Sequence, residues 1–192
     1  LPHGYNVSFT TGWFRQADLK RPYAGVDANR YVYSNKGDFI QYFLKAGSFF
    51  YKGTMNDASL LAGVGMFSRV FYINDVKIRQ YVNFSYTKLF NRLGLDPLSI
   101  NNPFGVRYFS SDSARGDQRI SLHTETNSFL HYKILGFKFG PFAFADMSLL
   151  TPENEPFSIS DAFWGLGGGL RTRNEQLVFG TIELRLAWFP RK

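Results

Sequence analysis

Apolar and polar residues alternate along most of the chain with a period of two, which is the pattern of a β-strand with two unlike faces. The pattern is clearest in residues 76–89, where the apolar face is interrupted only by Gln80. Signals for helices are nearly absent. We therefore predict an all-β, antiparallel protein with about nine strands, at 5–13, 23–33, 39–51, 60–72, 76–89, 119–130, 134–149, 161–173 and 177–189.

The lengths of the strands and of their connections narrow the fold class. Strands of roughly ten residues are long enough to cross a bilayer when they are tilted. Short connections alternate with longer ones, as in a sheet that crosses a membrane, and this favours an antiparallel transmembrane β-barrel over a soluble sandwich. The short connections are 34–38, 74–75, 132–133 and 174–176. The longer connections are 15–22, 52–59, 91–118 and 151–160.

The strand count suggests that the barrel extends beyond this chain. Bacterial barrels normally have an even number of strands, whereas nine are predicted here. Residues 189–192 have the composition of the start of a loop. We therefore expect residues 1–192 to form a single membrane β-barrel domain, as a fragment that lacks N-terminal strands and the last strand.

Composition agrees with a barrel without requiring one. Mean hydropathy is −0.21 and 44% of residues are hydrophobic, values that a soluble protein and a barrel share because only alternate barrel residues meet lipid. No run of about 18 apolar residues occurs, which excludes helical membrane spans. Trp13, Trp164 and Trp188 fit aromatic girdles at membrane interfaces. The absence of cysteine removes disulfides and thiol chemistry.

The formal net charge of +7 raises the question of an anionic partner, either nucleic acid or lipid. The basic residues are scattered rather than clustered, which favours a solvated surface and a charged lumen and predicts no nucleic-acid partner. Four charged residues lie in phase on the last two predicted strands. We expect these to be charged residues of the lumen: Arg171, Arg173, Glu183 and Arg185.

Residues 91–118 form the longest stretch without a strand pattern, and loops of this length are usually functional. Arg107 lies within it. An arginine in an enclosed lumen needs fixed partners, and carboxylates bind its planar fork best. Glu125 and Asp146 follow on later strands and could hold the loop through Arg107. The alternative is that Arg107 is solvated, with the two acids pairing instead with Arg119 or Lys138.

The run Val106-Arg107-Tyr108-Phe109 resembles the Val/Ile-Arg-Gly-Phe/Tyr motif of the BamA/TamA family of outer-membrane assembly barrels. In that family a long loop folds into the lumen of a sixteen-strand barrel, and inward carboxylates hold the motif arginine. Glu125 and Asp146 match those carboxylates. The resemblance covers roughly 23–191 and includes the glycine-rich 165–169 and the run 177–185. Tyr108 departs from the motif, whose glycine permits close approach to the barrel wall.

The resemblance implies a Gram-negative outer-membrane protein that takes part in the insertion or export of outer-membrane proteins. The implied partners are outer-membrane lipid and lipopolysaccharide, with nascent outer-membrane proteins and accessory lipoproteins. Two alternatives remain, namely a small pore or structural barrel, and a membrane anchor for a fused domain. The implied loop-docking residues are Val106, Arg107, Tyr108, Phe109, Glu125 and Asp146.

No enzymatic site is predicted. Ser121, His123 and Glu125 lie in one row, but alternate residues of a strand are roughly 6.5 to 7 Å apart, too far for a hydrogen-bonded triad. The sequence has no Gly-x-Ser-x-Gly elbow, phosphate loop or metal-ligand spacing. No helix signal follows the glycines of 165–169, which favours a curved strand over a phosphate site. We expect no catalytic residue, metal or cofactor.

Overall fold

The structure is a computed structural model that describes residues 3–16, 19–101, 103–111, 113–134, 136–152, 155–158, 162–174 and 181–190. The nine strands of the main path are β1 (Gly4–Gln16), β2 (Leu19–Tyr33), β3 (Phe39–Tyr51), β4 (Thr54–Phe67), β6 (Val76–Phe90), β9 (Gln118–Phe129), β11 (Phe137–Thr151), β12 (Ala162–Asn174) and β13 (Ile182–Trp188). Four short strands are β5 (Phe71–Ile73), β7 (Leu98–Ser99), β8 (Arg115–Gly116) and β10 (Lys133–Ile134).

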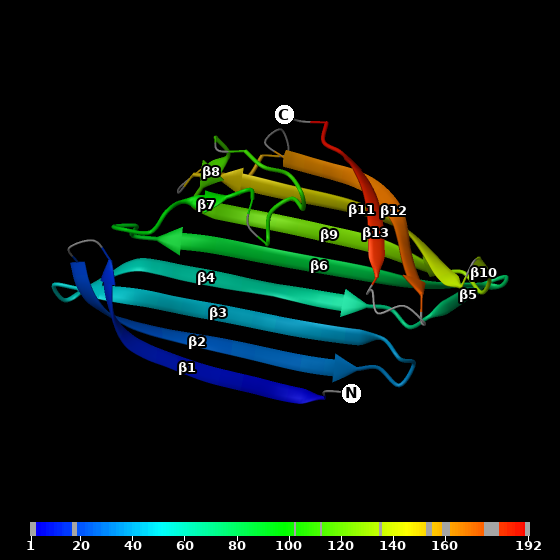
Figure 1. Cartoon of the computed structure of the whole chain (residues 1–192). Coiled ribbons are helices and arrows are strands. Elements are labelled where there is room, and N and C mark those ends of the chain that lie inside the picture. The colour runs from blue at the N-terminus through cyan, green and yellow to red at the C-terminus, as the bar shows by residue number, and fades with distance from the viewer. Residues whose placement is uncertain are drawn as a thin grey trace.

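The long strands form one antiparallel sheet in the order β1-β2-β3-β4-β6-β9-β11-β12-β13, so each pairs with its neighbours along the chain. β5 and β10 extend the sheet beside β6 and β11, and β7 pairs only with β8. Figure 1 shows a curved sheet whose last strand, β13, curls across in front of β11, and the loop between β6 and β9 lies on the concave side. The predicted all-β antiparallel fold and its nine main strands are confirmed. Among the described residues, β1 and β13 do not pair with each other.

Two of the four long connections predicted from the sequence are wrong. β1 and β2 pair as far as Gln16 and Leu19, so residues 15–22 are largely strand. Residues 54–59 are also strand, and only Lys52 and Gly53 form the turn before them. Both turn residues have left-handed φ angles, 49° and 79°, so the chain reverses within two residues. Such a two-residue turn matches the twist of a tight hairpin. The regular alternation of short and long connections is therefore not observed.

The other predicted bounds agree more closely. β3 matches the predicted strand 39–51, and the turns at 34–38 and 74–75 are present. The predicted strand 60–72 is interrupted, since β4 ends at Phe67 and β5 begins at Phe71. Between them Ser68 Oγ accepts the backbone N–H of Gln80. Parts of the connections 151–160 and 174–176, and residues 177–180 of the last predicted strand, lie outside the described residues.

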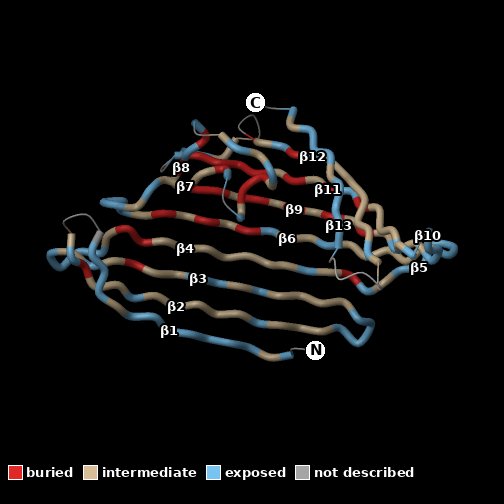
Figure 2. Tube along the Cα trace, in the orientation of Figure 1, coloured by how far each residue is buried: buried red, intermediate tan, exposed pale blue. Residues whose placement is uncertain are grey.

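The two faces of the sheet invert the usual distribution of a globular protein. The inner face, defined here as the concave face covered by the β6–β9 loop, carries buried polar side chains on the central strands β9 and β11 (Figure 2). Buried polar residues in this region include Arg119, Ser121, His123, Glu125, Asn127, Asp146 and Ser148. The opposite, outer face carries exposed apolar side chains, among them Tyr5, Phe9, Trp13, Leu184, Leu186 and Trp188. Buried polar groups and exposed apolar patches are the informative exceptions in a fold.

Glycines on the inner face make room for aromatic rings of neighbouring strands. A Cβ at Gly63 would lie 2.4 Å from both Phe43 Cζ and the backbone oxygen of Phe84. A Cβ at Gly167 would lie 2.6 Å from Phe144 Cζ. These glycines let the strands bend while their neighbours keep large side chains on the concave side. No helix in the described part of the chain is long and apolar enough to cross a membrane.

We predict that Gly63→Ala destabilises the sheet by about 1–3 kcal/mol, because the new methyl group overpacks against backbone that cannot move away. Gly65→Ala is the matched control on the same strand, since its Cβ would meet only the side-chain nitrogen of Asn83, at 3.2 Å. Urea unfolding of the two variants checks this. Equal stability of the two variants would contradict the packing argument.

Candidate functional site

The loop between β6 and β9 is a compact element with its own apolar core. β7 and β8 pair within it, with Leu98 opposite Gly116. Arg119 of β9 donates from Nη1 to the carbonyl of Ser99 at 2.6 Å and so ties this small hairpin to the sheet. The core of the loop and of the strand ends beneath it consists of Leu89, Leu98, Ile100, Val106, Ala114 and Leu150.

The tip of the loop packs closely against the sheet, and glycines make this approach possible. A Cβ at Gly105 would lie 1.8 Å from the carbonyl oxygen of Ile100, so only glycine fits there. Val106 is 2% exposed and packs against Gly165 of β12, where a Cβ would lie 2.9 Å from Val106 Cγ1. Phe109 contacts Phe163 at a ring-centroid distance of 5.8 Å. The predicted docking residues Val106 and Phe109 therefore hold the tip against the wall by apolar packing.

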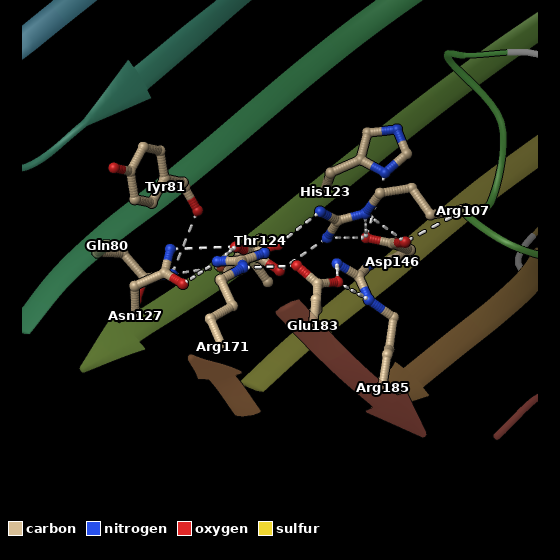
Figure 3. A network of polar contacts seen from close by, with 11 residues as sticks. Gln80, Tyr81, Arg107, His123, Thr124, Asn127, Asp146, Arg171, Glu183 and Arg185 are labelled. Atoms are coloured by element: carbon tan, nitrogen blue, oxygen red, sulfur yellow. Dashed lines mark hydrogen bonds and ion pairs between the residues drawn. The ribbon is translucent and has the colours of Figure 1, made fainter. Parts of the chain in front are cut away.

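Arg107 reaches from the loop tip to two carboxylates on neighbouring strands (Figure 3). Its Nε and Nη2 donate to Asp146 of β11 at 2.8 and 2.7 Å, and its backbone N–H donates to the same carboxylate at 3.2 Å. Its Nη1 donates to Glu125 of β9 at 2.9 Å, and Nη2 also donates to the carbonyl of Thr124 at 3.3 Å. The structure thus brings together the arginine and both acids singled out in the sequence, and the alternative pairing of the acids with Arg119 or Lys138 is wrong.

The charge of Arg107 is secured by these contacts. Burial disfavours the ionised guanidinium, but the hydrogen bonds and Coulomb attraction of Asp146 and Glu125 outweigh it and raise the Arg107 pKa above its usual value. Asp146 has no exposed side-chain surface and Glu125 has 11%, so solvent screens these pairs little. The loop tip is therefore held by a charged and well-satisfied set of hydrogen bonds.

Three further charged residues extend these contacts into a network of alternating sign. Arg171 of β12 donates to Glu125 from Nη1 at 2.8 Å and to Glu183 of β13 from Nε at 2.6 Å. Arg185 donates from Nε to the other oxygen of Glu183 at 2.7 Å. Followed from contact to contact, the network runs Arg185, Glu183, Arg171, Glu125, Arg107 and Asp146. Three guanidinium groups therefore balance three carboxylates. Each member has at least one partner of opposite charge, and such networks strengthen the order of their members.

Tyr108 has a backbone conformation that favours glycine. Its φ is +64°, in the left-handed region, and its side chain is 65% exposed. The guanidinium carbon of Arg185 lies 4.2 Å from the centre of the Tyr108 ring, within cation–π range. Tyrosine at position 108 therefore does not prevent docking of Arg107. It adds a contact between the loop tip and β13.

Two further polar residues of β9, His123 and Asn127, lie beside the network and were not predicted to belong to it. His123 faces Asp146 across the β9–β11 ladder with Nδ1 3.2 Å from Oδ1, although without hydrogen-bond geometry. Asn127 donates to Glu125 at 3.0 Å and accepts from Arg171. Both could have been predicted, because His123 and Asn127 are each two residues from Glu125 and so share its face of β9. Arg173, predicted as a charged residue of the lumen, is exposed near the end of β12 and joins none of these contacts among the described residues.

Comparisons with protein-family models, with curated protein sequences and with solved structures found no match for this chain. No group of three or more histidine, cysteine, aspartate or glutamate residues suited to a metal ion occurs in the described part of the chain. Ser121 bonds to Ser148 at 2.8 Å, and no serine–histidine–acid triad is present there.

We predict that Arg107→Lys weakens docking of the loop tip by about 1–3 kcal/mol, because lysine keeps the charge but cannot supply the fork of donors that Asp146 and Glu125 share. Arg107→Met should cost more, since it leaves both carboxylates without this partner. Limited proteolysis within 91–117, with mass-spectrometric mapping, measures the docking. Equal resistance of the wild-type protein and both variants would show that Arg107 does not hold the loop.

We predict that Tyr108→Gly is more stable than Tyr108→Ala by about 1 kcal/mol, because only glycine adopts the left-handed φ at this position without a steric cost. Both variants lose the contact with Arg185, so their difference isolates the backbone. Chemical unfolding of the two variants measures it. An alanine variant at least as stable as the glycine variant would contradict the strained geometry.

Proposed function

We propose that this chain is a segment of the membrane-spanning wall of an outer-membrane β-barrel of the BamA/TamA type, with a role in inserting or exporting outer-membrane proteins. The proposal also assigns it to a Gram-negative outer membrane, with lipid and lipopolysaccharide around the barrel. In such a barrel further strands complete the wall toward sixteen. The mechanism lies in a wall that bends and a loop that stays docked inside it, and no covalent chemistry is involved.

One observation carries the membrane assignment, namely the opposite character of the two faces. On the outer face, Phe9, Leu186 and Trp188 are 81%, 76% and 63% exposed. The inner face buries charged residues such as Asp146, which is 1% exposed. A soluble sheet buries its apolar face, whereas a membrane barrel exposes that face to lipid and keeps polar groups in its interior. The observed arrangement supports the membrane barrel.

The dimensions of the strands support the same assignment. β1 and β3 have 13 residues each, and β2, β6 and β11 have 15 each. A tilted strand needs about 9–11 residues to cross the hydrocarbon core, so each of these is long enough. The strand residues in excess of that number extend the hairpins beyond the bilayer. The absence of long loops at 15–22 and 52–59 follows from this, because those residues continue the strands outside the membrane.

The docked loop supports the narrower assignment to the assembly-barrel type. An arginine at a loop tip, held by two carboxylates that project inward from neighbouring strands, is what the family resemblance implies. The network ties the loop to β9, β11, β12 and β13 together, so bending of this part of the wall has to act on the loop. Nascent outer-membrane proteins and accessory lipoproteins are the partners that this role requires.

We predict that all three tryptophans contact acyl chains. Trp13, Trp164 and Trp188 lie on the outer face and are 79%, 40% and 63% exposed. With the protein reconstituted in liposomes, brominated lipids should quench most of the tryptophan fluorescence, while aqueous iodide should quench little. Strong quenching by iodide and none by brominated lipid would rule out the membrane assignment.

The assembly role is tested by measuring insertion of a second outer-membrane protein into liposomes that contain wild-type protein or Arg107→Met. The proposal expects the wild type to accelerate insertion and the variant to lose most of that acceleration. Acceleration that Arg107→Met leaves unchanged would remove the role of the loop. An ion conductance in planar bilayers, without any acceleration of insertion, would instead establish the pore alternative.

A further inference from the structure

A second set of charged contacts lies at the base of the same loop, where the chain leaves β6. Asp57 of β4 accepts hydrogen bonds from three consecutive backbone amides. The N–H groups of Leu93 and Leu95 donate to Oδ1 at 2.6 and 3.2 Å, and that of Gly94 donates to both oxygens at 3.0 Å. Consecutive N–H groups that converge on one anion form a nest. Asp57 therefore holds the first turn of the loop directly.

Arg21 of β2 completes this set of contacts from two strands away. Its Nη1 pairs with Oδ2 of Asp57, and the exposed fractions of the two side chains are 1% and 0%. Its guanidinium carbon lies 4.5 Å from the centre of the Phe49 ring on the intervening β3. A buried ion pair persists only where further hydrogen bonds offset its desolvation, and the amides of the loop supply them here. The pair and the loop base therefore depend on each other.

Backbone hydrogen bonds and left-handed φ angles around Asp57 also hold the start of the loop in place. The N–H of Asp57 donates to the carbonyl of Asn91 at 2.9 Å, and the side chain of Asn91 donates to the carbonyl of Met55 at 3.3 Å. Both Asp57 and Asn91 have left-handed φ angles, 49° and 46°. Such conformations persist in residues other than glycine when the surroundings determine them. The direction in which the loop leaves the sheet is set at this point.

We propose that Arg21 and Asp57 are positioning residues that form a second anchor for the loop, separate from the anchor at Arg107. The base anchor fixes 93–95 and sends the chain over the inner face toward the β7–β8 hairpin. Fewer residues of the loop are then left to be ordered when its tip docks, which lowers the entropy cost of docking. This role does not depend on membrane insertion and goes beyond the proposed function.

Amide hydrogen exchange of the folded full chain, resolved by residue, tests the proposal. In Asp57→Asn the protection of the amides at 93–95 should fall about 10- to 100-fold, because hydrogen bonds to a charged group contribute about 1.5–3 kcal/mol and each 1.4 kcal/mol is tenfold. The Arg107 amide should change by no more than about twofold, because loop-closure entropy changes only slowly with the number of residues left free. Arg107→Met should give the reverse pattern.

Three further variants keep the result interpretable. Asp27→Asn is the matched control, because it breaks a partly exposed ion pair with Lys45 on the same sheet and should change neither set of amides. Arg21→Met should give a smaller loss at 93–95 than Asp57→Asn, and Arg21→Lys should recover part of it. The proposal fails if 93–95 stay protected in Asp57→Asn or if the Arg107 amide loses protection equally. It also fails if both Asp57→Asn and Arg21→Met lose protection throughout the sheet.

Discussion

The guanidinium of Arg107 between Asp146 and Glu125 is the interaction on which the interior of this protein depends. Without it, two carboxylates on adjacent strands would face each other in a site with little exposed surface, and like charges at such a site repel strongly. Glu125 also receives Arg171 on its other oxygen, and the alternating network continues to β13. One loop residue thus makes a charged inner wall stable and fixes the tip of the loop that carries it.

That constraint explains why the two faces of the sheet differ so sharply. The inner face has to supply partners for an arginine, so its central strands present carboxylate, amide, hydroxyl and imidazole groups in register. Glycines between them leave room for Phe43 and Phe144 and for the loop. The apolar side chains of the same strands then have only the outer face, where they stay exposed within this chain. A lipid environment is the setting in which that exposure is favourable.

Much of this was predictable because a strand repeats every two residues. Alternation placed Glu125 on the polar face of its strand, and the order of the strands placed the strand of Asp146 beside it. That both acids point inward came only from the family resemblance. The turn at Lys52-Gly53 escaped prediction because a left-handed φ at lysine has no strong sequence signal, unlike that of an Asn-Gly turn. The contact between Arg21 and Asp57 was invisible for another reason. The two residues are 36 positions apart in the sequence. The β3–β4 pairing between them shifts register at Gly47–Phe49, and such a bulge cannot be deduced from alternation.

The most direct test of the central claim uses the absence of cysteine in the chain. Single cysteines at 82, 83, 84 and 85 of β6, each carrying a spin label in liposomes, report access to oxygen in lipid and to a nickel chelate in water. Labels at 82 and 84 should favour oxygen, whereas those at 83 and 85 should be shielded from lipid. A profile without this two-residue period, or one with lipid contact at 83 and 85, would contradict a polar interior organised around Arg107.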